Sequence, residues 1–345
     1  MFLGIEIGGT KLQLGVGAGD GSPLVALERF TVDAEAGGEG LRQQIETTAK
    51  ELQKRFNVQG VGIGFGGPFN QREGRTIKSH HVAGWDDFPL VAWCQQLLHC
   101  PVSVENDADT AGLAEALFGA GRGCDPVLYL TIGTGIGGGL IQRGEIYRGT
   151  GRGAVEIGHL RPGLQADQPE AIVESFAAGW GIAAAAQTAL TEPIAHSFSS
   201  LTSHIGPAAD AEDMRLALIE AEDQREQHAA DLLDRCQGQP ELLTTKLVSE
   251  AAQEGNLLAQ QILHRAWRAL GWAIAQAITL LAPEVVILGG GVSLIGETHF
   301  FQPLRDQISL YVFPPLLDTY RLLPASLGEE VVIHGALALA RSKGK

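Results

Sequence analysis

Three clusters of glycine limit the fold of this chain more than any other feature, because each cluster directly follows a short apolar segment. The clusters lie at residues 8–9, 133–139 and 289–291, after the apolar segments 2–7, 127–132 and 285–288. Glycine accounts for 45 of the 345 residues, against an average usage of roughly 7%. Because glycine has no Cβ, its backbone can turn sharply and come close to a ligand. The pattern therefore predicts buried strands that run into tight turns.

Strand-like and helix-like segments alternate along the chain, which is typical of an α/β fold. A buried strand is expected at residues 58–65 and a shorter one at 102–104, directly before a helix that begins near Asn106. Helical periodicity also covers residues 257–282, where Pro283 ends the helix because proline cannot continue it.

Two similar turns stand at the heads of two halves of the chain. Gly8-Gly9-Thr10 has a counterpart in Gly133-Thr134-Gly135, which suggests a duplicated architecture with a cleft between two lobes. We expect an N-terminal α/β lobe at residues 1–120 and a larger C-terminal α/β lobe at 121–345. Within the second lobe, the polar and charge-mixed stretch at about 192–240 is expected to form a helical insertion.

Charge and composition exclude several classes of protein. The net charge of −15 argues against a nucleic acid as the partner. The N-terminus lacks a basic segment followed by a long apolar run, so no signal peptide is expected. The most apolar helical stretch, residues 269–282, is shorter than a membrane span. Four scattered cysteines without a C-x-x-C pair indicate reduced thiols. We therefore expect a cytoplasmic protein without a membrane partner.

The glycine-rich segment at 133–139 could be mistaken for a dinucleotide-binding loop. Gly133, Gly135 and Gly138 fit the G-x-G-x-x-G spacing, but that fingerprint requires a helix directly afterwards. Here residues 139–147 alternate and turn like a β-hairpin, and the chain contains no Gly-Lys-Ser or Gly-Lys-Thr phosphate loop. Any single cluster could be only a tight turn. Three clusters after three strands favour phosphate binding by hairpins.

The motifs that surround these clusters resemble those of the ROK family (repressors, open reading frames, kinases) of the actin-like ATPase superfamily. The resemblance follows the family's order through the segments 5–11, 62–68, 105–108, 130–139, 156–159 and 287–292. It implies a two-lobed actin-like ATPase (ribonuclease H-like) fold with a cleft between the lobes. It also implies transfer of a phosphoryl group from Mg²⁺-ATP to a hexose-type sugar, as in glucokinases, and a homodimer.

The resemblance assigns roles to individual residues. It implies that Asp107 is the general base. The residues implied to bind the sugar are Gly67, His81, Asn106, Asp107, Glu156, His159 and Glu174. Those implied to bind the nucleotide are Glu6, Gly8, Gly9, Thr10, Lys11, Gly133, Thr134, Gly135, Gly290 and Gly291. Glu6 is expected to face the magnesium ion through a water molecule.

The chemistry of these residue types agrees with the implied roles, although each has a simpler alternative. Phosphoryl transfer needs mainly alignment and charge stabilisation, so one carboxylate near the attacking hydroxyl is enough. Carboxylate, amide and imidazole groups match the donors and acceptors of sugar hydroxyls. Alternatively, Asp107 could be only a helix N-cap, His159 a structural histidine, and Glu174 a first-turn carboxylate, while Gly290 could simply end a strand.

The chain departs from the family pattern at three places. Glu6 stands where the family carries Asp, and His81 where a sugar-binding Asn is expected. The cysteines of the family's zinc motif are missing between His159 and Glu174, so we expect no structural zinc. The alternatives are an N-acetylhexosamine or fructose kinase, a non-catalytic sugar-binding regulator, or a DNA-binding repressor. The acidic charge and a first strand within the opening residues disfavour the repressor.

Overall fold

The computed structural model describes residues 1–33, 35–78, 82–151, 153–163, 168–191 and 224–343. The first lobe is built on a five-stranded sheet with the order β3-β2-β1-β4-β7. Its strands are β1 (Phe2–Ile7), β2 (Lys11–Gly17), β3 (Ala26–Thr31), β4 (Val61–Phe65) and β7 (Val102–Asn106). A small ribbon of β5 (Phe69–Asn70) and β6 (Arg75–Thr76) follows β4.

The second lobe contains another five-stranded sheet, with the order β10-β9-β8-β11-β12. Its strands are β8 (Val127–Ile132), β9 (Ile136–Gln142), β10 (Glu145–Ile146), β11 (Val285–Gly289) and β12 (Arg321–Pro324). In each sheet a β-hairpin pairs beside parallel strands, since β1 pairs with β2 and β8 with β9 in the antiparallel direction. The two sheets therefore repeat one pattern, as the two similar turns in the sequence suggest.

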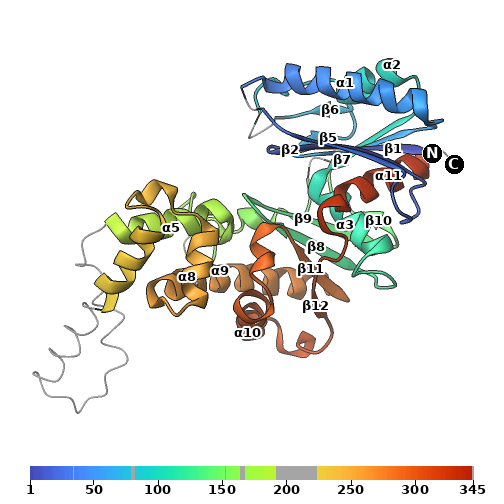
Figure 1. The fold of residues 1–345 in the computed structure, drawn as a ribbon. Coiled ribbons are helices and arrows are strands. Elements are labelled where there is room, and N and C mark those ends of the chain that lie inside the picture. Colours follow the sequence, from blue (N-terminus) through green and yellow to red (C-terminus); the bar gives the residue numbers. More distant parts are fainter. Residues whose placement is uncertain (34, 79–81, 152, 164–167, 192–223, 344–345) are drawn as a thin grey trace, which may run out of the picture.

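Helices separate and cover the two sheets (Figure 1). They are α1 (Gly37–Arg55), α2 (Leu90–Leu98), α3 (Asp107–Phe118), α4 (Val173–Ala177), α5 (Gly179–Thr191), α8 (Thr245–Gln253), α9 (Leu257–Leu281), α10 (Gln302–Tyr311) and α11 (Val331–Lys343). The helix α11 packs on β1 and β4, and α3 packs between α11 and the strands β8 and β9. On the outer faces, α1 and α2 cover the first sheet, and α9 and α10 lie beyond the second (Figure 1).

The burial of the strands explains why these segments form sheet interiors. Every residue of β4 and β11 is buried, as expected for parallel strands with helices on both faces. One apolar cluster joins the first sheet to α1 and α2, and a larger one joins the second sheet to α9 and α10. In the described part of the chain, no helix combines the length and the apolarity that a membrane span requires.

The two-lobed α/β arrangement and the hairpin interpretation of residues 133–139 are confirmed, with differences at the ends of elements. The returning strand begins at Ile136 rather than Gly139, because Gly133 to Gly135 are enough to close the turn. The alanine-rich segment after Glu174, whose composition up to about Leu190 predicts one helix, is divided, since Ala178 is extended between α4 and α5. Residues 224–235 of the expected insertion are helical, and 192–223 lie outside the described residues. The lobe boundary near residue 120 stays a prediction.

Candidate active site

The candidate site begins where the parallel strands of the first sheet end. Ile7 of β1 pairs with Phe65 of β4, and Phe65 pairs with Asn106 of β7. Because the carboxyl ends of parallel strands lie at one edge of a sheet, the residues that follow these strands meet there. They are the first glycine turn, the glycine-rich segment after β4, and Asp107.

Asp107 is the first residue of α3, and the cap of this helix is the preceding Asn106. The Asn106 Oδ1 atom accepts hydrogen bonds from the backbone N–H groups of Ala108, at 2.8 Å, and Asp109, at 3.4 Å. A methyl group placed on Gly66 would lie 3.2 Å from Asp107 Oδ2 and 3.2 Å from Gly8 Cα. The Asp107 carboxylate thus lies where the first glycine turn and the segment after β4 meet.

Buried Glu6 forms an ion pair with the partly exposed Lys11 near this carboxylate. The Lys11 Nζ atom lies 3.2 Å from Glu6 Oε1, and Gln13 Nε2 donates to Glu6 Oε2 at 2.8 Å. Burial, with a smaller contribution from the nearby charge of Asp107 and against the opposing effect of Lys11, raises the pKa of Glu6 to about 7. Lys11 also donates to the backbone carbonyl of Glu329 at 3.2 Å, so its ammonium group is held beside Glu6.

The second glycine turn, between β8 and β9, is held by Glu174. The Oε2 atom of Glu174 accepts a hydrogen bond from the backbone N–H of Ile136 at 2.7 Å. A Cβ on Gly135 would lie 2.8 Å from the same oxygen, so the approach of the carboxylate requires glycine there. Glu174 is therefore more than a first-turn carboxylate of α4, because it orders the candidate phosphate turn from outside.

The third glycine cluster lies against the second one. Gly290 has a φ of 84°, and a Cβ at this position would be 2.4 Å from the carbonyl oxygen of Ile132, the last residue of β8. Thr134 and Gly291 line a common hollow of about 1030 Å³. Its other walls come from α5, α8 and the short helix at Gly291–Ile295, with Trp180 and Lys246 among the lining residues. This hollow is large enough for a nucleotide.

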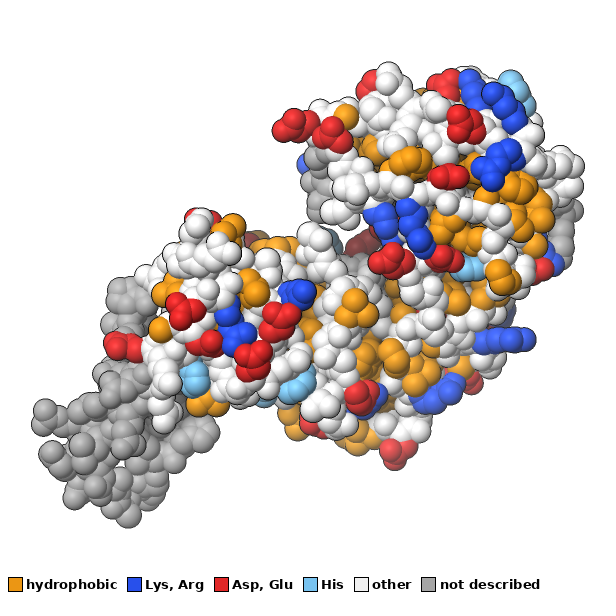
Figure 2. All heavy atoms as spheres, in the orientation of Figure 1, with side chains coloured by type: hydrophobic (Ala, Val, Ile, Leu, Met, Phe, Trp, Pro, Cys, Tyr) orange, Lys and Arg blue, Asp and Glu red, His pale blue; other side chains and the backbone are white. Residues whose placement is uncertain are grey.

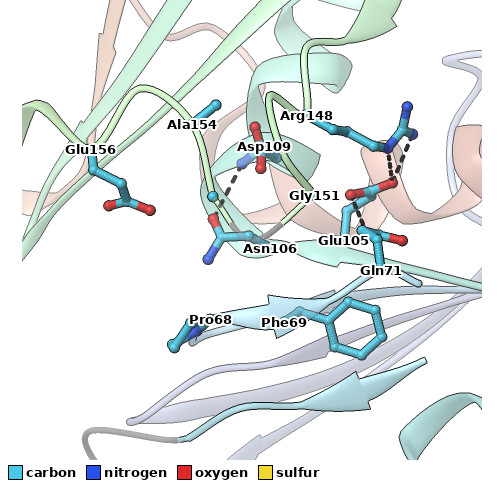
Figure 3. A pocket seen from close by; sticks show the side chains of 11 residues that line it. Pro68, Phe69, Gln71, Glu105, Asn106, Asp109, Arg148, Gly151, Ala154 and Glu156 are labelled. Carbon is cyan, nitrogen blue, oxygen red and sulfur yellow. Dashed lines mark hydrogen bonds and ion pairs between the residues drawn. The ribbon is translucent and has the colours of Figure 1, made fainter. Parts of the chain in front are cut away.

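A separate pocket, with Asn106 in its wall, is lined by residues from both lobes. Pro68 and Asn106 from the first lobe and Glu156 from the second line this pocket (Figure 3). The Asn106 Nδ2 atom donates to the carbonyl of Gly67 at 3.3 Å. The deep hollow between the lobes is visible in the space-filling view (Figure 2).

The remaining expected sugar ligands lie near one another. Partial burial raises the pKa of Glu156, while nearby His159 lowers it and Glu174 raises it. His159 ends a short 3-10 helix (Ile157–His159), and its backbone N–H donates to the Glu156 carbonyl at 3.1 Å. His81 lies outside the described residues. Among the described residues, no group of three or more His, Cys, Asp or Glu side chains could hold a metal ion.

The pocket also contains polar residues that the sequence did not single out. They are Gln71, Glu105, Asp109 and Arg148. Glu105 is buried and its Oε1 atom lies 2.7 Å from Arg148 Nη2, whereas Asp109 Oδ1 is buried without a hydrogen-bond partner among the described residues. Glu105 is a charged residue at a buried position of β7, directly before Asn106. Nothing in the local sequence marks Arg148.

Comparisons with known proteins agree with this geometry. The ROK family model matches residues 2–343. A glucokinase from Thermotoga maritima is 30% identical over 342 residues, which cover 99% of this chain and 98% of the relative.

Two crystal structures of ROK family kinases also match this chain over nearly its whole length. That of a ROK family glucokinase from Streptomyces griseus in complex with glucose and AMPPNP matches with a TM-score of 0.74 and 27% identity over 99% of both chains. That of a ROK hexokinase from Thermus thermophilus matches with a TM-score of 0.73 and 26% identity, over 99% of this chain and 98% of the hexokinase. The fold is that of the actin-like ATPases, and the chain belongs to the ROK family.

Proposed function

We propose that this protein, an ATP-dependent sugar kinase, transfers the γ-phosphoryl group of ATP to a hydroxyl of a hexose-type sugar, with Asp107 as the general base. One observation carries the proposal. A Cβ on Gly66, in the candidate sugar-side segment, would lie 3.2 Å both from Asp107 Oδ2 and from Gly8 Cα in the candidate phosphate turn, so the three meet at one point. A base for this reaction has to stand at such a junction, within reach of the attacking hydroxyl.

In the proposed reaction, Asp107 accepts the proton of the sugar hydroxyl as its oxygen bonds to the γ-phosphorus. The bond between this phosphorus and the bridging oxygen breaks, and ADP leaves. Asp107 occupies the first turn of α3, where the positive end of the helix dipole favours a carboxylate over a carboxylic acid. Asn106, Glu156, His159, Glu174 and the Gly67 backbone are the proposed sugar ligands, together with His81.

The nucleotide is proposed to lie in the hollow between the second and third glycine clusters, with its phosphates directed toward Gly8. Gly9, Thr10 and Lys11 would approach the phosphates from the first lobe, and Gly133 and Thr134 from the second. Backbone N–H groups in such turns are suited to anions. The overall charge of −15 is compatible with this, because the site needs only local donors.

The residues present fit a hydrated magnesium ion bound with the nucleotide. Both Glu6 oxygens are engaged by Lys11 and Gln13, so a contact through water suits Glu6 better than direct coordination. A magnesium ion keeps several of its waters in such sites, and when bound it neutralises charge on the β- and γ-phosphates. Glu6 would orient that water shell next to Asp107.

The sugar is proposed to be a hexose because the similar proteins above are called glucokinase and hexokinase. An N-acetylhexosamine or fructose kinase is the alternative. A non-catalytic sugar-binding regulator is disfavoured because Asp107 is present and lies beside both turns. The family resemblance also supports a homodimer, which light scattering of the purified protein tests. ATP as donor favours a cytoplasmic reaction.

The test is an ADP-release assay coupled to product analysis, with glucose, fructose, mannose and N-acetylhexosamines as acceptors. We expect Mg²⁺-dependent ADP formation that matches sugar phosphate mole for mole for at least one of these sugars. ADP release that is independent of every sugar, or sugar binding without turnover, would contradict the proposed function.

A further inference from the structure

Two polar side chains from distant parts of the chain, Gln71 and Arg148, meet at the Glu105 carboxylate (Figure 3). Arg148 donates from Nε to Glu105 Oε1 at 2.8 Å, and its Nη2 lies 2.7 Å from the same oxygen. Gln71 Nε2 donates to Glu105 Oε2 and also to the backbone carbonyl of Val104, the latter at 2.6 Å. Both oxygens of Glu105 are therefore occupied, which leaves this residue poorly suited to bind a sugar directly.

The cluster of Gln71, Glu105 and Arg148 connects the two lobes at the pocket that Asn106 and Glu156 line. Glu105 precedes Asn106 at the end of β7 in the first sheet, and Gln71 follows β5. Arg148 follows β10 of the second sheet, on the segment that leads through Gly151 to Glu156. The backbone N–H of Gln71 also donates to the carbonyl of Gly151 at 3.4 Å. Arg148 and Gly151 of the second lobe are thus tied to Glu105 and Gln71 of the first lobe.

The charges of the pocket make Arg148 the most important residue of this cluster, because it carries the positive charge. The described residues that line the pocket include three carboxylates, Glu105, Asp109 and Glu156, and Arg148 is their basic counterpart. The Glu105 side chain is 7% exposed and that of Arg148 is 44% exposed. A buried carboxylate that loses its partner is strongly unfavourable, so removal of Arg148 would leave the Glu105 carboxylate to repel that of Glu156 or to draw water into the pocket.

We propose that Arg148 is a positioning residue for the sugar: by pairing with Glu105 it holds the segment bearing Glu156 against the strand end bearing Asn106. The inference rests on the proposed function, because it takes Asn106 and Glu156 to be sugar ligands from the two lobes. A displacement of one ligand relative to the other weakens sugar binding. The ATP hollow has separate walls, so its affinity is preserved.

Kinetics of four variants test this inference. Arg148→Met leaves Glu105 uncompensated and should raise the KM for the sugar by about 10- to 100-fold, as small misplacements in an active site do. Arg148→Lys restores the charge but not the planar fork, so its KM should lie between those of wild type and Arg148→Met. Glu105→Gln alone and Glu105→Gln with Arg148→Met complete a double-mutant cycle. The double variant buries no charge at this position and should have a lower sugar KM than Arg148→Met.

The measurements are KM for sugar, KM for ATP, kcat and the thermal midpoint, together with titration calorimetry using glucose. Arg305→Met is the matched control, because Arg305 pairs with exposed Glu297 and neither residue lines the pocket that contains Asn106 and Glu156; its sugar KM should equal that of wild type. A sugar KM for Arg148→Met within twofold of wild type, or a rise in both KM values alike, would overturn the inference while leaving the proposed function intact. A wild-type protein that binds and phosphorylates no sugar would overturn both.

Discussion

Asp109→Asn should stabilise the ligand-free protein, and the gain should grow as the pH rises from 5 to 8. Asp109 lies on α3 with its Oδ1 atom buried and without a hydrogen-bond partner among the described residues. Burial, together with the charges of Glu105 and Glu156 and against the opposing charge of Arg148, raises the pKa of Asp109 to about 8. The native protein therefore keeps this carboxyl protonated at a pH where the unfolded chain releases the proton.

The direction in which the free energy of unfolding changes with pH follows from the number of protons bound in each state. Between the ordinary pKa of 3.8 and the native value of about 8, the folded state binds one more proton than the unfolded state, so the free energy of unfolding falls as the pH rises. Over the three pH units from 5 to 8, the free energy of unfolding of wild type can fall by at most about 4 kcal/mol through this group. Because water entry and relaxation reduce such energies in real interiors, we expect about 1–3 kcal/mol. The asparagine amide does not titrate.

Urea unfolding of wild type and Asp109→Asn at pH 5, 6, 7 and 8, without sugar or nucleotide, measures this difference. Asp318→Asn is the control, because Asp318 is exposed, and its effect should vary little over the range. An unfolding free energy difference between Asp109→Asn and wild type that stays constant from pH 5 to 8 would refute the reasoning.

Three further predictions concern the glycine turns and the metals. Glu6→Ala should weaken the Mg²⁺ dependence and turnover more than the sugar affinity; an unchanged magnesium titration would show that Glu6 has no role at the metal. Gly290→Ala should raise the KM for ATP at least tenfold, because its Cβ would lie 2.4 Å from the Ile132 carbonyl; a wild-type KM would exclude the close contact. Protein purified without a histidine tag should contain no stoichiometric zinc by elemental analysis, and one equivalent per chain would contradict the sequence prediction.

Local sequence was enough to predict the elements that carry the glycine turns. The apolar run before Gly133 and the alternation after it predict a hairpin rather than a strand and helix, and β8 and β9 form that hairpin. Residues 257–282 predict a long helix that ends at proline, and α9 spans Leu257–Leu281. These features depend on neighbours in the chain, and short-range chemistry determines them.

The polar network of the pocket could not be predicted in the same way. Arg148 pairs with a residue 43 positions earlier, and this contact exists because β7 and β10 end on facing sides of the pocket. Likewise, the hydrogen bond that Glu174 accepts from the Ile136 N–H depends on how α4 packs against α9 and the short helix Ile157–His159; its role as a sugar ligand stays a prediction. Such contacts follow from long-range packing, between the lobes for Arg148 and within the second lobe for Glu174, and no local sequence pattern predicts them.

The most direct test of the proposed mechanism is the rate of phosphoryl transfer by Asp107→Asn. The substitution keeps the size of the side chain and removes the base, while the N-cap at Asn106 remains in place. Sugar phosphate formation should be measured by rapid quench at saturating ATP and sugar, with sugar affinity measured separately by calorimetry. We expect kcat to fall by about 10²–10⁴-fold with a sugar Kd close to that of wild type, whereas a near-wild-type kcat would contradict the assignment of Asp107 as the base.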